Sequence, residues 1–491
     1  MIPIVTPTEM AAIDAAAPEP VEELIERAGG ALAAAALAML GGGYGRRVTV
    51  LAGPGNNGAD GRAAARRLQR RGVRTAVIST ADDPTALPPA HLAIDAAYGT
   101  GLRRPHGPPP PPASLDDPHV AAPILAADIP SGVDGLTGGI HGHCWTADGT
   151  VTFGALKPGL LLHPGAQHCG PVTVAPIGLD TTGARAHLVT AEDVGAWLPV
   201  RRPDTHKWRS ACWIVAGSPG MTGAAHLAAA AALRGGSGYV RLSTPGLDHD
   251  PAAPVEAVGF ALGHEPWARD VGLDHWSRFR AMLVGPGLGR EATTTQMIRD
   301  LVAHAPLPLV IDGDGLAALG GDAAERLAPR TAPTVLTPHD GEFHRLTGTR
   351  PDPDRFSSAR SLAAATRSVV LLKGPTTVVA HPDGPALVVT NGDARLATAG
   401  TGDVLAGLLC GLLSAGVEPF TAAAAAAWLH GRAAAATPPV GVTASDLPPR
   451  IPTAWEAALA AQPASPTRRA AQGTTAGDPG HATATTTEAS A

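Results

Sequence analysis

Cysteine is scarce in this chain, with four among 491 residues. Cys144, Cys169, Cys212 and Cys410 lie far apart and form no Cys-x-x-Cys pair. This spacing argues against a disulfide framework and a zinc site, and it suits a reducing compartment. The beginning of the chain also lacks the basic and apolar stretches of a signal peptide, and the alanine-rich runs are interrupted before they reach the ~20 residues that span a bilayer. The sequence therefore predicts a soluble, cytoplasmic protein that does not enter a membrane.

Charge is sparse as well. Charged residues make up 16% of the chain and the formal net charge is −6. No basic face is expected from this composition, which excludes nucleic acid as a predicted partner. The length predicts two or three domains.

Lysine and asparagine are the rarest polar residues. Of the 37 basic residues only three are lysines, and asparagine also occurs three times. Arginine cannot replace lysine at a tight site, so the positions that keep lysine or asparagine are candidates for function. Chance survival is the alternative interpretation. The six positions are Lys157, Lys207, Lys373, Asn56, Asn57 and Asn391.

The first part of the chain has the pattern of a doubly wound α/β sheet. A helix is predicted over residues 21–40, and a strand over 47–52 precedes the loop GPGNNGADG at 53–61. A helix over 62–71 and a strand over 74–79 complete a β–loop–α–β unit. Further strands are predicted at 91–97, 123–127 and 150–153, and each ends in a polar loop.

A second α/β unit follows a linker at 198–204. The linker predicts that each half has its own core. We therefore expect a first domain over 1–200, a second over 201–460 and a disordered tail over 461–491, which is rich in Ala and Thr without periodicity. The predicted strands of the second unit are 212–216, 282–284, 309–311, 333–336, 368–372, and a hairpin of 376–380 with 386–390.

The segment Arg395–Gly411, RLATAGTGDVLAGLLCG, is the strongest single motif. It predicts a strand end at 397–399, a glycine turn at 400–402 and a helix over 404–413. A helix that begins at a glycine turn binds anions through free N–H groups. Asp403 in such a turn is a candidate general base for phosphoryl transfer. The competing interpretation is that Asp403 only caps the helix.

Three oxygen-bearing side chains stand at predicted strand ends in the first half. Asn57, Asp95 and Ser131 could converge on a monovalent cation, since hard cations prefer oxygen ligands. The alternative is that Asn56-Asn57-Gly58 is only a turn and that Asp95 caps a helix. Asp128, in DIPSG, is a candidate acid or base.

The motifs taken together resemble two known families. EM-x-x-x-D, LIERAG, GPGNNGADG, DAAYGTGL, DIPSGVDG and TFGALKPG resemble the NAD(P)H-hydrate epimerase domain. GSPGMTGAAHLAAAAALRGGSGYV, GPGLG, LTPHDGEFHRL, LLKGPTT and ATAGTGDVLAG resemble the ADP/ATP-dependent NAD(P)H-hydrate dehydratase. The resemblance covers roughly residues 5 to 455, in order, and is closest to the bifunctional repair enzymes in which the two are fused. It implies a Rossmann-like three-layer αβα domain followed by a ribokinase-like α/β domain.

The resemblance also implies roles for the matching positions. Asp403 would be the base for phosphoryl transfer, and Asp128 a catalytic residue that contacts the hydrated cofactor. Further substrate-binding residues would be Asn56, Asn57, Gly58, Ala59, Asp60, Gly99, Thr100, Gly101, Leu102, Arg103, Arg104 and Pro105, and in the second half Ala224, Gly287 and His339. The nucleotide phosphates would be held by Lys373, Gly374, Pro375, Thr376, Thr377 and Gly402. The implied ions are K⁺ on Asn57, Asp95 and Ser131, and Mg²⁺ in the dehydratase domain.

The implied partners are hydrated NADH or NADPH and ADP or ATP as phosphoryl donor, and we expect a homo-oligomer. The chain departs from the family at Ala59 and at Gly313 and Gly315, where the family has Gly and Ala respectively. None of these changes removes a polar group. Two other functions stay open: a ribokinase-like small-molecule kinase, and a non-catalytic Rossmann-like binding module in the first half.

Overall fold

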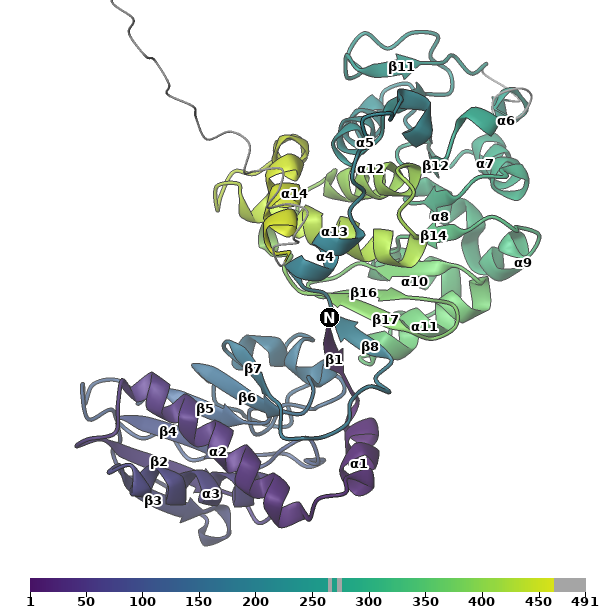
Figure 1. Cartoon of the computed structure of the whole chain (residues 1–491). Coiled ribbons are helices and arrows are strands. Elements are labelled where there is room, and N and C mark those ends of the chain that lie inside the picture. Colours follow the sequence, from purple (N-terminus) through teal and green to yellow (C-terminus); the bar gives the residue numbers. More distant parts are fainter. Residues whose placement is uncertain (264–266, 272–275, 463–491) are drawn as a thin grey trace, which may run out of the picture.

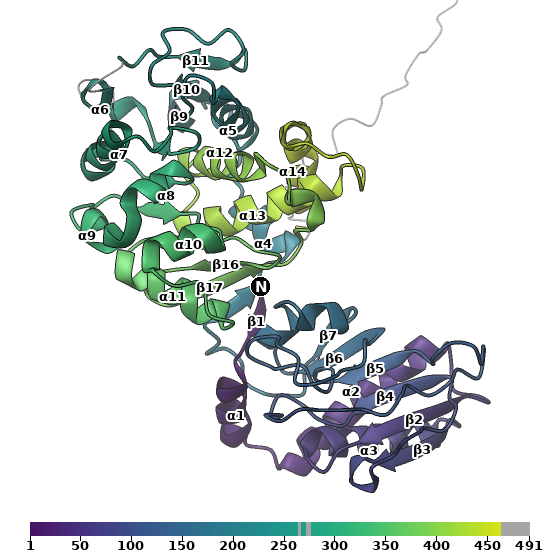
Figure 2. The ribbon, with the colours of Figure 1, turned by 180° about the vertical axis from the view of Figure 1, so that it is seen from behind.

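The computed structural model describes residues 1–263, 267–271 and 276–462. Each half of the chain is built around its own sheet, and the amino terminus lies between the two halves (Figures 1 and 2). Most of the predicted tail, from residue 463, lies outside the described residues. Within the described residues no helix is both long and apolar enough to span a bilayer.

The sheet of the first half has six parallel strands in the order β3-β2-β4-β5-β6-β7. The strands are β2 (Arg47–Ala52), β3 (Arg74–Ser79), β4 (Leu92–Ala96), β5 (Ile124–Ala127), β6 (Gly149–Phe153) and β7 (Val172–Ala175). Helices α2 (Val21–Leu40) and α3 (Asn56–Arg70) pack their apolar sides on one face. Leu87, Trp145 and Ala147, from segments between the helices and strands, cover the other face. The Rossmann-like prediction is confirmed, with loops forming most of the second outer layer.

The predicted β–loop–α–β unit is correct except at one boundary. The strands at 47–52 and 74–79 and the helix at 21–40 form as predicted. The helix predicted from Arg62 begins already at Asn56, so most of the glycine-rich loop, residues 56–61, is the first part of α3. Asn56-Asn57-Gly58 is therefore not a separate turn. A Cβ on Gly58 would lie 1.9 Å from the Gly53 carbonyl oxygen, so only glycine permits this close return of the chain.

Among its described residues, the second half contributes nine strands to a larger sheet. They are β9 (Ala211–Val215), β10 (Tyr239–Ser243), β11 (Ala257–Gly259), β12 (Ala281–Val284), β13 (Leu309–Ile311), β14 (Thr334–Leu336), β15 (Val369–Leu372), β16 (Thr377–Ala380) and β17 (Ala386–Val389). Their order is β17-β16-β15-β14-β13-β12-β9-β10-β11. The strands from β11 to β15 are parallel, and β15, β16 and β17 run antiparallel as the predicted hairpin requires.

Helices cover both faces of this sheet, which gives the α/β layers of the predicted ribokinase-like domain. On one face lie α4 (Ala191–Trp197), α5 (Thr222–Arg234), α12 (Thr401–Ser414), α13 (Pro419–Ala435) and α14 (Ile451–Ala460). On the other face lie α7 (Ala292–His304), α8 (Asp314–Leu319), α9 (Ala323–Leu327), α10 (Asp340–Thr347) and α11 (Arg355–Thr366), with the short α6 (Trp267–Asp270) beside them. Alternate strand residues enter the two cores, as the period of a strand requires.

Two strands outside the second half extend its sheet. β1 (Ile2–Ile4) pairs with β8 (Ala186–Leu188), and β8 pairs with β17. One apolar cluster also contains residues of both halves, for example Leu160 and Val378. The first half does have an apolar core of its own, between its sheet and helices α2 and α3, as predicted. The shared cluster is an addition that was not predicted, and it forms where the segment before the linker joins the second sheet. The boundary at residue 200 stays a prediction.

Candidate active sites in the two halves

Each sheet changes its winding direction at one point, and polar loops gather there. In the first half, the chain leaves β2 for β3 on one side and then returns to β4 on the other. In the second half the same change occurs between β9 and β12. Ligands of open α/β sheets bind at the carboxyl ends of the strands at this switch point. The topology therefore places one candidate site in each half.

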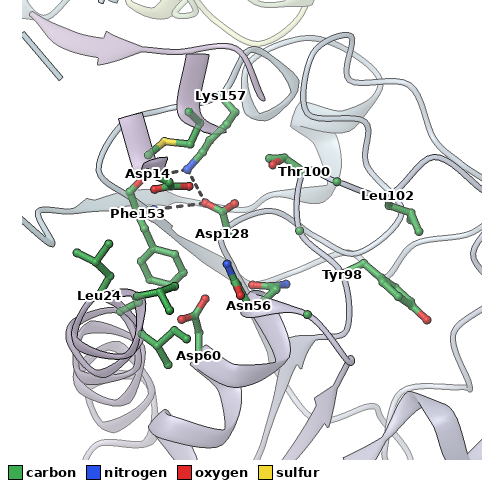
Figure 3. A pocket seen from close by; sticks show the side chains of 18 of the residues that line it. Asp14, Leu24, Asn56, Asp60, Tyr98, Thr100, Leu102, Asp128, Phe153 and Lys157 are labelled. Carbon is green, nitrogen blue, oxygen red and sulfur yellow. Dashed lines mark hydrogen bonds and ion pairs between the residues drawn. The ribbon is translucent and has the colours of Figure 1, made fainter. Parts of the chain in front are cut away.

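The site of the first half is a cavity of about 770 Å³ (Figure 3). Met10 and Asp14 of α1 (Pro7–Ala16) line it, together with the beginning of α3 and the loop after β4. The predicted residues that line the cavity are Asn56, Asn57, Asp60, Gly99, Thr100, Gly101, Leu102, Arg103, Arg104 and Asp128. Pro105 lines a smaller neighbouring cavity of about 250 Å³, and Gly58 and Ala59 line neither. The Ala59 methyl group therefore does not narrow the cavity.

Asp128 and Lys157 form an ion pair at the wall of this cavity. Lys157 Nζ lies 2.5 Å from Asp128 Oδ1, and Lys157 is 1% exposed. Asp128 has a backbone φ of 63°, a conformation that a non-glycine residue rarely adopts and that is common at functional sites. The backbone thus places the Asp128 carboxylate in a cavity and in contact with an ammonium group. A carboxylate with a specific charge partner in a cavity is a candidate for function.

Two more carboxyl groups face Asp128, and Figure 3 shows all three side chains around one space. Burial raises the pKa of Asp60 from 3.8 to about 8, and the negative charges of Asp128 and Asp14 add to the effect. Burial also raises the pKa of Asp14, while Lys157 lowers it. At neutral pH Asp60 is thus mostly protonated and can donate a hydrogen bond. The cavity thus holds a carboxyl group that can donate a proton, Asp60, and an ion-paired carboxylate, Asp128.

Of the three predicted cation ligands, Asn57 lines the cavity, and Asp95 and Ser131 are buried and bonded to each other. Ser131 Oγ donates to Asp95 Oδ1 at 2.6 Å, and Ser131 N donates to Asp95 Oδ2 at 2.8 Å. Asp95 is a buried residue of β4 and caps no helix, which excludes that alternative. Both polar atoms of the Asn57 side chain are buried and have no hydrogen-bond partner among the described residues. A buried amide oxygen without a hydrogen-bond partner fits a cation ligand, because a cation would satisfy it.

Lys157 and Asp14 were not predicted as site residues. The signal for Lys157 was present, because it is one of only three lysines and belongs to TFGALKPG. Asp14 belongs to EM-x-x-x-D, but nothing local indicates that α1 reaches a cavity built by the beginning of α3 and by the loops after β4 and β5. Its position depends on packing between distant segments.

The second site surrounds the beginning of α12. This helix begins at Thr401 with Gly400 as its N-cap, and 397–399 form no strand. Asp403 is therefore the third residue of the helix, not its cap, and it accepts no hydrogen bond from the described residues. Burial raises the pKa of Asp403 from 3.8 to about 6, and the charge of Asp312 contributes. A carboxyl group with a pKa near neutrality suits a general base.

Lys373 stands directly opposite α12. A Cβ on Gly402 would lie 3.6 Å from Lys373 Nζ and 4.0 Å from Asp312 Oδ2. Lys373 Nζ lies 2.9 Å from Asp312 Oδ1 and 3.5 Å from Glu342 Oε2. Burial alone would lower the pKa of Lys373, but the two carboxylates raise it above its usual value. Lys373 is thus a fixed positive charge beside the anion-binding end of a helix.

The residues expected around the hydrate in the second half lie at the same sheet edge. A Cβ on Gly287 would lie 3.0 Å from Ala224 Cβ, so the beginning of α5 and the loop after β12 meet there. The His339 imidazole caps α10: its Nδ1 accepts hydrogen bonds from the backbone N–H groups of Gly341 and Glu342. The backbone N–H of His339 donates to Glu342 Oε2. Through Glu342, His339 is linked to Lys373.

The segment from Lys373 to Thr377 connects β15 to β16. Arg355 donates to the Lys373 carbonyl oxygen at 2.9 Å, which fixes the turn. Thr376 is buried, and its hydroxyl donates to the carbonyl oxygen of Leu161 in the first half. The Thr376 side chain is therefore engaged across the junction. Gly374, Pro375 and Thr377 remain predicted phosphate contacts through this segment.

Fold and sites together define a fusion of a Rossmann-like half and a ribokinase-like half, each with charged side chains at its switch point. Comparison with known proteins agrees. The family described as NAD(P)H-hydrate dehydratase matches residues 212–453, and the family described as YjeF-related protein N-terminus matches 21–86 and 75–159. The described fold thus follows the order of the two matches.

Full-length relatives carry both parts. The bifunctional NAD(P)H-hydrate repair enzyme Nnr of Salinibacter ruber is 36% identical over 477 residues, covering 82% of this chain and 86% of that protein. The enzyme of the same name from Mycobacterium leprae is 37% identical over 421 residues, covering 80% and 84%. The solved ADP/ATP-dependent NAD(P)H-hydrate dehydratase from Bacillus subtilis, co-crystallised with ATP and Mg²⁺, is 33% identical, covers 55% of this chain and 97% of its own, and has a TM-score of 0.49. The chain belongs to the family of bifunctional NAD(P)H-hydrate repair enzymes.

Proposed function

We propose that this chain repairs hydrated NADH and NADPH in two steps. The first half interconverts the two epimers of the hydrate, and the second half dehydrates the S-epimer to the reduced cofactor at the expense of ADP or ATP. Family membership supports the pair of activities. The observation that carries the dehydration step is the position of Asp403, beside Gly402 and opposite Lys373.

Dehydration needs a better leaving group than hydroxide. Phosphorylation of the hydroxyl group supplies one, and the lone pair of the ring nitrogen then expels the phosphate. Asp403 takes the proton of the attacking hydroxyl group. Lys373 and the Gly402 N–H stabilise the charge of the transferred phosphoryl group, because fixed donors at the point where charge develops lower the barrier.

Mg²⁺ fits the second site as a companion of the nucleotide. It is usually held by one or two carboxylates and by phosphate oxygens, so it needs no protein cage. Asp312 Oδ2 accepts no hydrogen bond from the described residues and faces Gly402, so it is available to the ion. Bound Mg²⁺ would neutralise phosphate charge during transfer.

The first half holds the hydrate in the cavity beside Asp128. The beginning of α3 and the loop at 99–105 would contact its phosphates and ribose, because free N–H groups at a helix N-terminus favour anions. K⁺ on Asn57, Asp95 and Ser131 would tie the loop after β4 to α3. The unpartnered amide of Asn57 supports this ion.

The decisive experiment uses a mixture of both hydrate epimers with ADP or ATP, followed by the absorbance of regenerated NADH. Complete conversion of the mixture is the expected result, since epimerisation feeds the stereospecific dehydration. Conversion that stops when one epimer is consumed would refute the epimerase half. Accumulation of a stable phosphorylated product would instead indicate a small-molecule kinase. A cytoplasmic location and a homo-oligomeric state complete the proposal.

A further inference from the structure

Among the described residues, every hydrogen-bond donor to the Asp128 side chain binds the same oxygen atom, Oδ1. Lys157 Nζ and Thr152 Oγ1 donate to Oδ1 at 2.5 Å and 3.0 Å, and the Phe153 N–H donates at 3.4 Å. The other oxygen, Oδ2, faces the loop after β4, because a Cβ on Gly99 would lie 3.6 Å from it. Among the described residues, Oδ2 accepts no hydrogen bond. One oxygen is therefore fixed by the protein, and the other faces the cavity.

The ammonium group of Lys157 is fully used inside the protein. Besides Asp128 Oδ1 it donates to Thr152 Oγ1 and to the Phe153 carbonyl oxygen, both at 2.9 Å. An ammonium group has three donors, so none is left for a ligand. Lys157 therefore has no donor for a bound hydrate, and its direct contact with a carboxylate of the cavity is the one with Asp128.

We infer that Lys157 is a positioning residue for epimerisation, which holds Asp128 so that Oδ2 exchanges a proton with the hydroxyl group of the hydrate. This inference rests on the proposed epimerase function and assigns the reacting atom within it. Thr152 assists by fixing the same oxygen. The scarcity of lysine in this chain agrees with a requirement for a compact ammonium group at this position.

The proton exchange accounts for epimerisation without any further reactant. The carbon that bears the hydroxyl group is bonded to the ring nitrogen. Asp128 Oδ2 takes the hydroxyl proton, a carbonyl group forms, and the carbon–nitrogen bond breaks with its electron pair on nitrogen. Asp128 returns the same proton to that nitrogen. Rotation about the adjacent carbon–carbon bond presents the other face of the carbonyl group, and the reverse steps close the ring with the opposite configuration.

The test measures interconversion of the separated epimers by chromatography, without ADP or ATP so that dehydration is silent. For Lys157→Met we expect kcat to fall about 10²-fold or more, the usual scale of a disabled acid–base group. KM should stay within about threefold, because Lys157 has no donor left for the hydrate. Dehydration of the S-epimer in the same variant should be normal. Arg70→Met is the control, since Arg70 is an exposed cation at the end of α3 and does not line the cavity.

A second variant separates positioning from packing. In Lys157→Ala, ethylammonium chloride should restore a large part of kcat, whereas tetramethylammonium chloride at the same concentration should not. Wild-type kcat in Lys157→Met would overturn the inference, and so would a folded Lys157→Ala that no amine rescues. Loss of cooperative unfolding in both variants would assign Lys157 to stability and overturn it too. If the wild-type protein itself fails to interconvert the epimers, the proposed epimerase function fails instead.

Discussion

Asp403 should destabilise the fold that carries it. Its pKa is raised from 3.8 to about 6, with burial as the largest cause, so the folded protein binds this proton more tightly than the unfolded chain does. Ionisation of Asp403 therefore costs the folded state free energy. The cost is complete above the folded pKa of about 6 and disappears below the unfolded value of 3.8. A difference of two pKa units corresponds to about 3 kcal/mol, which is an upper limit.

Asp403→Asn removes this cost and the base together. At pH 8 we expect the variant to be more stable than the wild type by up to about 3 kcal/mol, with an increase in Tm of up to about 10 °C for a domain of this size. The advantage should shrink as the pH falls from 7 to 4. Dehydration should drop about 10²-fold or more. Epimerisation should continue, because Asp403 lies in the other half.

The measurements are thermal unfolding at pH 8 and pH 4.5 and NADH regeneration at pH 8. Asp248→Asn is the matched control, since Asp248 is exposed in the same half. Full NADH regeneration in Asp403→Asn would refute the catalytic assignment. A variant that is less stable than the wild type at pH 8, or a stability difference that does not change with pH, would refute the electrostatic argument.

Three further predictions test other contacts. Lys373→Arg should lower the dehydration rate at least tenfold with little change in Tm, because a guanidinium group is too large for the space between Asp312 and Gly402; near-normal turnover in the absorbance assay would contradict this. K⁺ should raise the Tm of the protein more than equal Li⁺, by mass action on the site of Asn57, Asp95 and Ser131, and identical melting curves would count against the ion. Thr376→Val should lower the free energy of unfolding by about 1 to 3 kcal/mol, because it leaves the buried Leu161 carbonyl oxygen unpaired, and should barely change the KM for ADP; a large rise in that KM would show that the hydroxyl group binds phosphate instead.

The helices and strands that were predicted correctly are those whose pattern lies within a short stretch of sequence. The strand at 47–52 and the helix at 21–40 have continuous apolar patterns and form with the predicted bounds. The beginning of α3 was placed too late because Asn, Gly and Asp favour turns when their partners are unknown. Asn56 to Asp60 are nevertheless helical. The helix can begin so close to the preceding loop because Gly58 has no Cβ that would meet the Gly53 carbonyl oxygen.

Sites were predicted less completely than folds, for a physical reason. Asn57, Asp95, Ser131 and Asp128 follow from their places at the ends of neighbouring parallel strands, since those ends share one edge of a sheet. Asp14 comes from a helix before the sheet, and no local pattern predicts its approach to the cavity. The pairing of β1 with β8 joins residues more than 180 positions apart through three-residue strands, and so short a pattern carries little information.

β1 and β8 extend the sheet of the second half, because β8 also pairs with β17, and β1 lies next to the loop that carries Lys157. Val5 N donates to the Leu156 carbonyl oxygen at 2.9 Å, so the segment after β1 holds the residue next to Lys157. Thr376 of the second half binds Leu161 at the other end of the same loop. Hydrogen bonds therefore hold the loop that carries Lys157 at two places: at Leu156 by the residue after β1, and at Leu161 by the residue before β16. Lys157 lies between these two contacts and makes three hydrogen bonds with its ammonium group. We therefore expect substitutions at the junction, such as Thr376→Val, to affect the first site through this loop.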